Sequence, residues 1–402
     1  VGFAITLGVG IHQIFTPKIT SPLRGEGEGE GWFFKRQNLY ILVVSAIIIS
    51  IYSFGVIQRN KIWLNGYSLW SDIVRKMPES SKAHYNMGNA SSEQGQLDEA
   101  IKELKLALSL KPDYAEAHNG LGIAYAKQGQ LDEAIKEYTL ALTLKSNFAE
   151  AHNNLGNVYE KQGQLDESIK EYRIAIKINP DFAVAYNNLG NVYFKQGRID
   201  EAIKEYQITL ELKPDYPASH YNLGNVYFKQ GRLEDAIKEY QIALELKPDY
   251  PTAHINLGNA YDDKGRLEDA IKEYQIALEL KSDFVEAYNN LGLVYSKQGK
   301  FDDAIKNYLI AIRIKPELSE AYGNLGLAYN MLGQVDEAIK AYFTFLKLNP
   351  DDAVAHYNLA LTYNRKGLKD EVIKELETAL KLKPDYQLAR QALEAIRNKK
   401  PD

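Results

Sequence analysis

The apolar and small residues of this chain recur with a fixed spacing of 34 residues from residue 81 onward, without an insertion or a deletion. We number the positions of each repeat from 1 to 34, so that Ser81 is position 1 of the first repeat. Positions 4, 7, 8 and 11 fall on one face of an α-helix. A second apolar set follows, with a small residue at position 20 and an aromatic one at position 24 in repeats two to eight. The pattern therefore predicts two helices per repeat.

The ends of these helices carry clear signals. A glycine at position 15 is typical of a left-handed helix C-terminus, and it occurs in every repeat: Gly95, Gly129, Gly163, Gly197, Gly231, Gly265, Gly299, Gly333 and Gly367. Acidic residues at positions 18 and 19 suit the start of the second helix. Proline at position 32 prevents that helix from continuing, and only Ser146 and Ser282 replace it in the array.

Nine such repeats cover residues 81–386. Neither helix of one repeat can bury its apolar face alone, so stacking of neighbours must supply the core. Glycine at position 8 and alanine at position 20 allow the two helices to approach closely. The outer repeats depart from the pattern, with Leu104 and Leu376 at the aromatic position and Ala360 at position 8. We expect residues 387–402 to form a solvating cap helix and a tail.

The repeat closely resembles the tetratricopeptide repeat (TPR) family, as the run from Tyr221 to Gly231 (YNLGNVYFKQG) illustrates. The resemblance implies an all-α, right-handed superhelical solenoid of nine helix-turn-helix repeats, which serves as a scaffold for protein binding. The same phase extends upstream, where Trp70 falls at the aromatic position and Pro78 at position 32. We therefore expect residues 58–80 to be a degenerate half-repeat.

The N-terminal end has a different pattern. Residues 39–57 carry no charge, and a helix of that length just crosses the roughly 30 Å hydrocarbon core of a membrane. Basic and aromatic residues flank this run, so we predict a transmembrane helix; a buried core helix is the alternative. Residues 1–16 are also apolar and predict part of another span, and residues 17–38 predict a flexible linker. We expect the chain to be the C-terminal part of a longer membrane protein.

The segment between residues 60 and 78, where the predicted membrane span gives way to the repeats, resembles the same segment in transmembrane-and-TPR proteins. The membrane domain of that family is similar to O-mannosyltransferases. That resemblance implies extracytoplasmic repeats that present protein acceptors to a glycosyltransferase-like membrane domain. The acidic residues proposed for catalysis in that family lie in early membrane loops, and this sequence contains no matching segment. The positive-inside rule also favours repeats outside the cytoplasm.

The composition excludes several kinds of functional site. The formal net charge is −5, which argues against a protein that coats nucleic acid. The chain has no cysteine, which excludes a thiol nucleophile and a metal site with cysteine ligands. We identify no phosphate-binding loop and no catalytic residue, and we expect no cofactor. Six of the seven histidines occupy position 4, where tyrosine stands in other repeats. One histidine per layer cannot converge on a single metal ion, so we interpret these histidines as packing residues and expect no metal.

The other face of the first helix, at positions 6, 9, 12 and 13, lines the concave groove in this family. Asparagines fill positions 6 and 9 through repeats three to six, at Asn154, Asn157, Asn188, Asn191, Asn222, Asn225, Asn256 and Asn259. The remaining candidate groove residues, at positions 12 and 13, are Phe194, Phe228, Lys161, Lys195 and Lys229. Amide side chains can bond the backbone of an extended peptide without reading its sequence. Alternatively, these residues are family consensus and the lysines are merely solvated.

Two functions remain open at this stage. The first is a membrane-tethered scaffold that binds a polypeptide in its groove, with Phe194 and Phe228 making a joint apolar contact and the lysines favouring an acidic or polar ligand. The second is the C-terminal part of an O-mannosyltransferase-type enzyme. Position 5 never carries lysine, so the two-carboxylate clamp of chaperone-binding TPR domains is not indicated.

Overall fold

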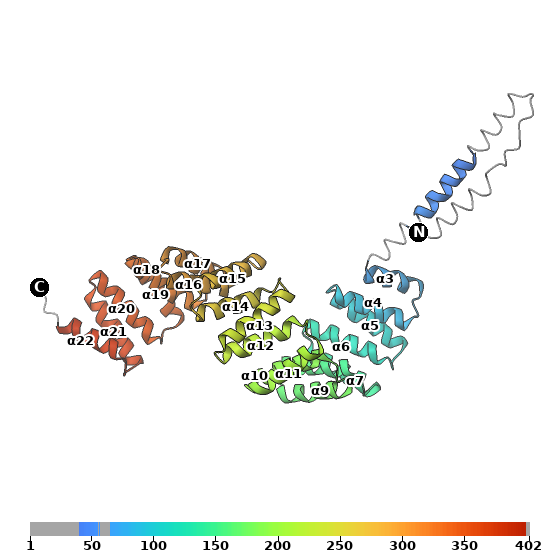
Figure 1. The fold of residues 1–402 in the computed structure, drawn as a ribbon, viewed down its shortest axis with the longest axis horizontal. Coiled ribbons are helices and arrows are strands. Elements are labelled where there is room, and N and C mark those ends of the chain that lie inside the picture. Colours follow the sequence, from blue (N-terminus) through green and yellow to red (C-terminus); the bar gives the residue numbers. More distant parts are fainter. Residues whose placement is uncertain (1–39, 55, 57–64, 399–402) are drawn as a thin grey trace, which may run out of the picture. The chain divides into compact units, whose positions relative to one another are not determined.

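The computed structural model describes residues 40–54, 56 and 65–398, and every element in this part of the chain is an α-helix (Figure 1). The prediction of an all-α repeat protein is thereby confirmed. The chain divides into two compact units, residues 1–112 and 113–402, and each is considered by itself. In the first unit, residues 40–54 and 56 are helical, followed by α3 (Gly66–Lys76), α4 (Ser81–Glu93) and α5 (Leu97–Leu110).

The second unit continues as pairs of helices, one pair per repeat. Its helices are α6 (Ala115–Gln128), α7 (Leu131–Leu144), α8 (Ala149–Lys161), α9 (Leu165–Ile178), α10 (Ala183–Lys195), α11 (Ile199–Leu212), α12 (Pro217–Lys229), α13 (Leu233–Leu246), α14 (Pro251–Asp263), α15 (Leu267–Leu280), α16 (Val285–Lys297), α17 (Phe301–Ile314), α18 (Ser319–Met331), α19 (Val335–Leu348), α20 (Ala353–Lys366), α21 (Lys369–Leu382) and α22 (Gln387–Asn398). Each first helix packs against its own second helix, and each second helix packs against the next repeat.

The predicted helix ends are present. Gly231 follows α12 with φ of +72°, and all nine position-15 glycines have positive φ, a conformation that costs glycine little. Proline starts α12 and α14, where its missing N–H and fixed φ are harmless. At the other end of the repeat, the Lys247 N–H bonds to the Ala243 carbonyl, and Pro248 follows directly. Local sequence therefore sets both ends of each helix pair.

The close approach of the paired helices explains the glycine at position 8. A Cβ atom built on Gly224 would lie 2.5 Å from Cε1 of Tyr240, which is fully buried. The same crowding recurs at Gly156 and Tyr172. Glycine at position 8 and tyrosine at position 24 are therefore one packing unit, because the ring occupies the volume that a side chain would need.

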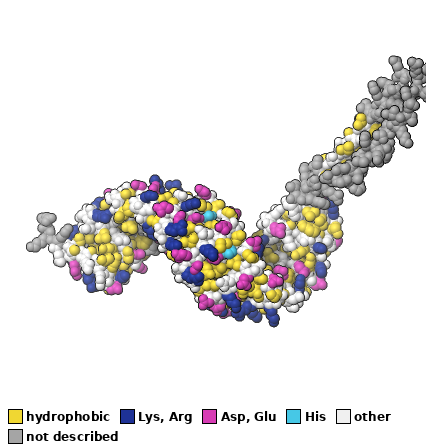
Figure 2. Space-filling view, in the orientation of Figure 1, with side chains coloured by type: hydrophobic (Ala, Val, Ile, Leu, Met, Phe, Trp, Pro, Cys, Tyr) yellow, Lys and Arg dark blue, Asp and Glu magenta, His cyan; other side chains and the backbone are white. Residues whose placement is uncertain are grey.

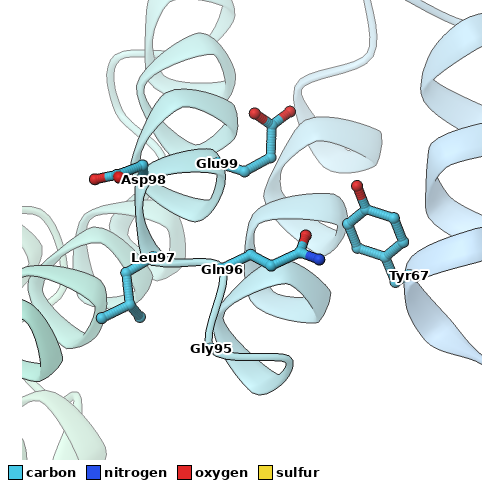
Figure 3. Close-up of a pocket in the computed structure, with 6 residues that line it drawn as sticks. All are labelled: Tyr67, Gly95, Gln96, Leu97, Asp98 and Glu99. Carbon is cyan, nitrogen blue, oxygen red and sulfur yellow. The ribbon is translucent and has the colours of Figure 1, made fainter.

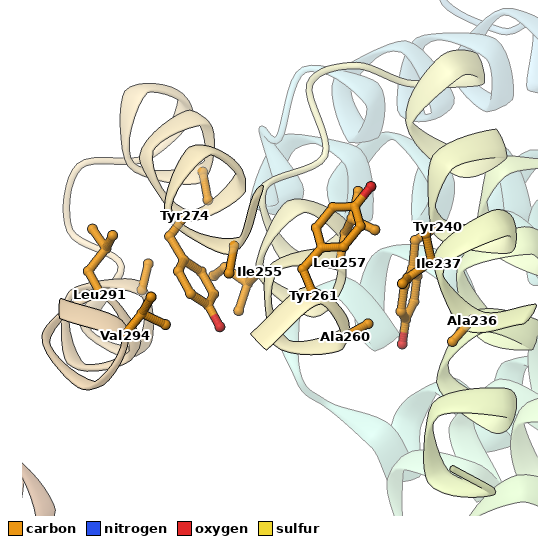
Figure 4. Packing of buried hydrophobic residues seen from close by; sticks show 13 residues of the cluster. Ala236, Ile237, Tyr240, Ile255, Leu257, Ala260, Tyr261, Tyr274, Leu291 and Val294 are labelled. Atoms are coloured by element: carbon orange, nitrogen blue, oxygen red, sulfur yellow. The ribbon is translucent and has the colours of Figure 1, made fainter. Parts of the chain in front are cut away.

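The core forms between repeats as well as within them. Tyr274 of α15 lies between α14, which carries Ile255, and α16, which carries Leu291 and Val294 (Figure 4). All four side chains are almost inaccessible to solvent. Each repeat thus completes the core of its neighbour, as the sequence pattern requires.

The predicted membrane span needs correction. No helix in the described ranges is long and apolar enough to cross a membrane, so the structure does not support a transmembrane helix over 39–57. Residues 39 and 57 themselves, together with the segments 1–16 and 17–38, lie outside the described residues.

Candidate functional site

Five of the thirteen predicted groove residues line a hollow of about 250 Å³ on the second unit. We call the surface formed by positions 6, 9, 12 and 13 of the first helices the groove. The hollow joins repeats three to five and is lined by Glu160, Asn191, Phe194, Lys195, Tyr206, Asn222 and Asn225. Five of these seven residues were predicted from the sequence; Glu160 and Tyr206 were not.

A hydrogen-bond network converges on the asparagine at position 9. The Asn191 Oδ1 atom accepts from the Tyr206 hydroxyl at 2.8 Å and from the Asn222 amide Nδ2, one repeat further on, also at 2.8 Å. The same two bonds meet at Asn225, from Tyr240 and Asn256. Equivalent pairs of hydrogen bonds, one from a tyrosine hydroxyl and one from the next asparagine amide, are accepted by Asn157 and Asn259. The network thus links neighbouring repeats from three to seven.

This network changes the expected role of the asparagine amides. The Nδ2 atom of Asn222 also donates to the Asn187 Oδ1 atom at 3.1 Å, so both of its hydrogens are used inside the protein. The Nδ2 atom of Asn191 and the Oδ1 atom of Asn222 have no hydrogen-bond partner among the described residues, and both side chains are half-buried. The Asn191–Asn222 pair therefore offers one donor and one acceptor to a ligand, whereas the corresponding oxygen of Asn188 accepts from the Asn187 amide at 3.4 Å.

Positions 12 and 13 interact between adjacent repeats. The Lys195 Nζ atom lies 2.6 Å from the Glu160 Oε1 atom, and the Lys229 Nζ atom lies 5.1 Å from the centre of the Phe194 ring. The charge of Lys195 is therefore neutralised by Glu160 of the preceding repeat. The side chain of Lys161 is exposed. Phe194 packs against one core cluster and Phe228 against another, and their joint apolar contact with a ligand stays a prediction.

The histidines at position 4 have a polar role that sequence analysis missed. The Nδ1 atom of His220 lies 2.7 Å from the Glu239 Oε2 atom, and its Nε2 atom lies 3.2 Å from the Pro214 carbonyl. Both neighbours are acceptors, so the doubly protonated ring satisfies both contacts. Burial opposes this charge, but the hydrogen bonds to Glu239 and Pro214 outweigh it and raise the pKa of His220.

The same histidine–glutamate pair, with nitrogen–oxygen distances of 2.5–2.7 Å, occurs at His84–Glu103, His118–Glu137, His152–Glu171, His254–Glu273 and His356–Glu375. In repeat four Tyr186 replaces the histidine, and burial raises the pKa of the partner carboxyl of Glu205. Repeats seven and eight lack both partners, with Asn307 and Ala341 at position 23. In the described ranges no group of three or more histidine, aspartate or glutamate side chains is arranged to hold a metal ion.

A second hollow, of about 450 Å³, lies in the first unit and was not predicted (Figure 3). Tyr67 of α3 and Gln96 of the turn before α5 face one another across it, while Leu97 and Asp98 point away. Glu99 and Gly95 complete its lining.

Charged side chains are mixed in sign over the surface. On the face drawn in Figure 2, basic and acidic groups are interspersed. Several are paired within the turns, as at Arg232 and Asp235, whose atoms lie 2.7 Å apart. Such a face lacks the concentrated positive charge that phosphate backbones attract.

The sequence matches the family of TPR repeats over residues 88–129, 124–163, 161–197, 190–231, 224–265, 258–299 and 328–367. Two further matches to the tetratricopeptide repeat cover residues 285–318 and 353–386. Together these matches span more than half of the chain.

Among curated proteins, the chain is similar to protein O-mannosyl-transferase TMTC1 of Homo sapiens, with 31% identity over 81 residues. The matched segment is 20% of this chain and 9% of that protein. The corresponding protein of Mus musculus is 32% identical over 72 residues, 18% of this chain and 8% of that protein. The match thus spans less than a tenth of these relatives.

Among solved structures, the APC/C hetero-tetramer Cut9–Hcn1 superposes with a TM-score of 0.50 and 17% identity, covering 81% of this chain and 80% of that one. This likeness concerns the fold. YrrB, described as a TPR protein with an unusual peptide-binding site, has a TM-score of 0.42 and 25% identity, covering 47% of this chain and 97% of that one.

Proposed function

We infer that this chain, which belongs to the tetratricopeptide repeat family, is a scaffold that binds an extended polypeptide segment in the groove of repeats three to six. The observation that carries this proposal is the hollow at Asn191, Phe194 and Asn222, where an unpaired amide donor and an unpaired carbonyl acceptor stand beside an aromatic ring.

The groove chemistry suits a peptide backbone better than a particular side chain. Each backbone unit carries one donor and one acceptor, and the Asn191 Nδ2 and Asn222 Oδ1 atoms offer the complementary pair. The internal network fixes these side chains in advance, so less conformational entropy is lost on binding. Phe194 adds an apolar surface that is half-buried before any ligand arrives.

The experiment uses peptides selected from a random dodecapeptide library against the whole chain. Their affinity is then measured for the variant that carries Asn191→Asp and Asn225→Asp. Aspartate keeps the oxygen acceptors for Tyr206, Asn222, Tyr240 and Asn256 but removes the free amide donors. We expect affinity to fall about tenfold or more, since each lost hydrogen bond contributes about 0.5–1.5 kcal/mol.

The matched control carries Gln207→Glu and Gln275→Glu, which add the same charge on exposed positions of α11 and α15. This control should bind the peptides with unchanged affinity. If no peptide is selected, or if the aspartate variant binds as tightly as the unchanged chain, the proposal is wrong.

The partial match to protein O-mannosyl-transferase TMTC1 supports a second candidate. The chain would then be the C-terminal part of a membrane enzyme of that type, with extracytoplasmic repeats that present protein acceptors in the groove. In the full-length protein, the two aspartate substitutions should lower mannose transfer to protein acceptors without lowering transfer to acceptor peptides that lack a groove-binding sequence. Equal loss for both acceptors would contradict a presenting role for the repeats.

A further inference from the structure

We propose that the groove changes its ligand preference at repeat seven, and that repeats seven to nine bind a polypeptide segment with large apolar side chains beside an acidic one. This inference rests on the proposed function, because it assigns a second section to the same groove. It concerns the surface of α16, α18 and α20, whose successive helices are in contact.

The residue at position 9 marks the change. It is asparagine in repeats three to six, and it becomes Leu293, Leu327 and Leu361 in repeats seven to nine. Leu327 is 52% exposed and Leu361 is 40% exposed, whereas Leu293 packs against the core. Position 13 changes in the same region, where Met331, 55% exposed, replaces the lysine of earlier repeats. We call Leu327, Met331 and Leu361 the apolar stripe.

The change also interrupts the internal network. Leucine cannot accept hydrogen bonds, so the hydroxyl of Tyr308 turns to the Ser296 Oγ atom, 3.3 Å away. One repeat further on, the Tyr342 hydroxyl and the Asn324 Nδ2 atom are buried and have no hydrogen-bond partner in the described chain. Exposed apolar side chains and unpaired buried polar atoms both cost stability. The exposed apolar side chains are typical of a surface that a partner covers.

Charge indicates the acidic residue of the partner. Arg365 is exposed at position 13 of repeat nine, and no carboxylate among the described residues forms an ion pair with it; it donates only to the Asn330 carbonyl. In repeat seven, by contrast, Lys297 is neutralised by Asp262 at 2.7 Å. The acidic residues Glu286 and Glu320 lie in the first turns of α16 and α18, away from Met331 at the end of α18. A ligand carboxylate therefore fits best beside Leu361 and Arg365.

The test uses four pools of fluorescein-labelled decapeptides and the whole chain. The first pool alternates Leu, Ile, Phe or Met with Ser and carries two acidic residues at one end. The second pool replaces the acidic residues with amides, the third replaces them with lysine, and the fourth replaces the apolar residues with Ser. We expect the first pool to bind at least tenfold more tightly than the fourth, and severalfold more tightly than the second and third.

Variants then assign the binding to the apolar stripe. Leu327→Asn with Leu361→Asn installs the residue of repeats three to six and should weaken binding of the first pool at least tenfold. Met331→Lys is a second variant that leaves position 9 intact and should weaken it severalfold. Arg365→Gln should remove the preference for the acidic pool over the amide pool. Helicity measured by circular dichroism should not change in any of these variants.

The result is separable from the groove of repeats three to six. Asn191→Asp with Asn225→Asp should leave binding of the first pool unchanged, even if those substitutions abolish binding of the library-selected peptides. The inference is overturned if the four pools bind equally, or if the first pool binds the Leu327→Asn, Leu361→Asn variant as tightly as the unchanged chain.

Discussion

The amide of Asn222 reaches back one repeat to donate to the Oδ1 atom of Asn191 at 2.8 Å. That oxygen also accepts from the buried Tyr206 hydroxyl. One asparagine therefore ties together the aromatic core of its own repeat and the groove surface of the next. Ligand binding and repeat stacking consequently depend on the same side chains.

The first prediction concerns the acceptor of this network. Asn191→Leu copies the residue of Leu327 and leaves the Tyr206 hydroxyl without an acceptor. Because an unsatisfied buried donor costs about 1–3 kcal/mol, unfolding in urea should show a loss of that size. Asn191→Asp keeps the acceptor and should lose clearly less. Equal losses for the two variants would show that the network contributes nothing measurable.

The second prediction concerns the packing of glycine against tyrosine. Gly224→Ala should destabilise the array by about 1–3 kcal/mol, because the added Cβ atom meets the Tyr240 ring. Repeat nine combines Ala360 with Leu376, so the double change Gly224→Ala, Tyr240→Leu should cost less than the sum of the two single changes. A double-mutant cycle measures this coupling. Strict additivity would contradict the packing argument.

A third prediction concerns overpacking at position 20. Ala236 of α13 is fully buried against the paired helix. Ala236→Leu inserts three carbon atoms where no space exists and should cost about 1–3 kcal/mol. Hydrogen exchange should show the loss concentrated in repeats four to six, because each repeat contacts only its neighbours. Uniform deprotection from α6 to α22 would contradict a locally stabilised array.

The fourth prediction concerns pH. The pKa of His220 is raised in the folded protein, so its ion pair with Glu239 stabilises the fold fully below the unfolded pKa of about 6.5. That contribution should disappear as the pH rises through the folded pKa. His220→Gln should therefore be destabilised relative to the unchanged chain at pH 6 and much less so at pH 9. A stability difference that does not change with pH would contradict a charged His220.

The sequence predicted the helix pairs, the glycine and proline residues at their ends, and the tyrosine core. Each of these features depends on residue spacing within one repeat. The network between Asn191 and Asn222 did not, since side-chain direction decides which amide atoms remain free for a ligand. The histidine–glutamate pairs had a sequence signal that we missed: the histidine at position 4 always accompanies a glutamate at position 23. The span over 39–57 was predicted from an uncharged run with basic and aromatic flanks, and no helix among the described residues is long and apolar enough to cross a membrane.

The most direct test of the central claim places a photo-crosslinking amino acid at Phe194 in the groove and, as a control, at exposed Gln275 on α15. Each protein is irradiated with the same library-selected peptide, and the products are mapped by mass spectrometry. We expect a crosslinked peptide from position 194 and none from position 275, with excess unlabelled peptide suppressing the product. Crosslinking from position 275 and not from position 194 would contradict a polypeptide-binding groove on repeats three to six.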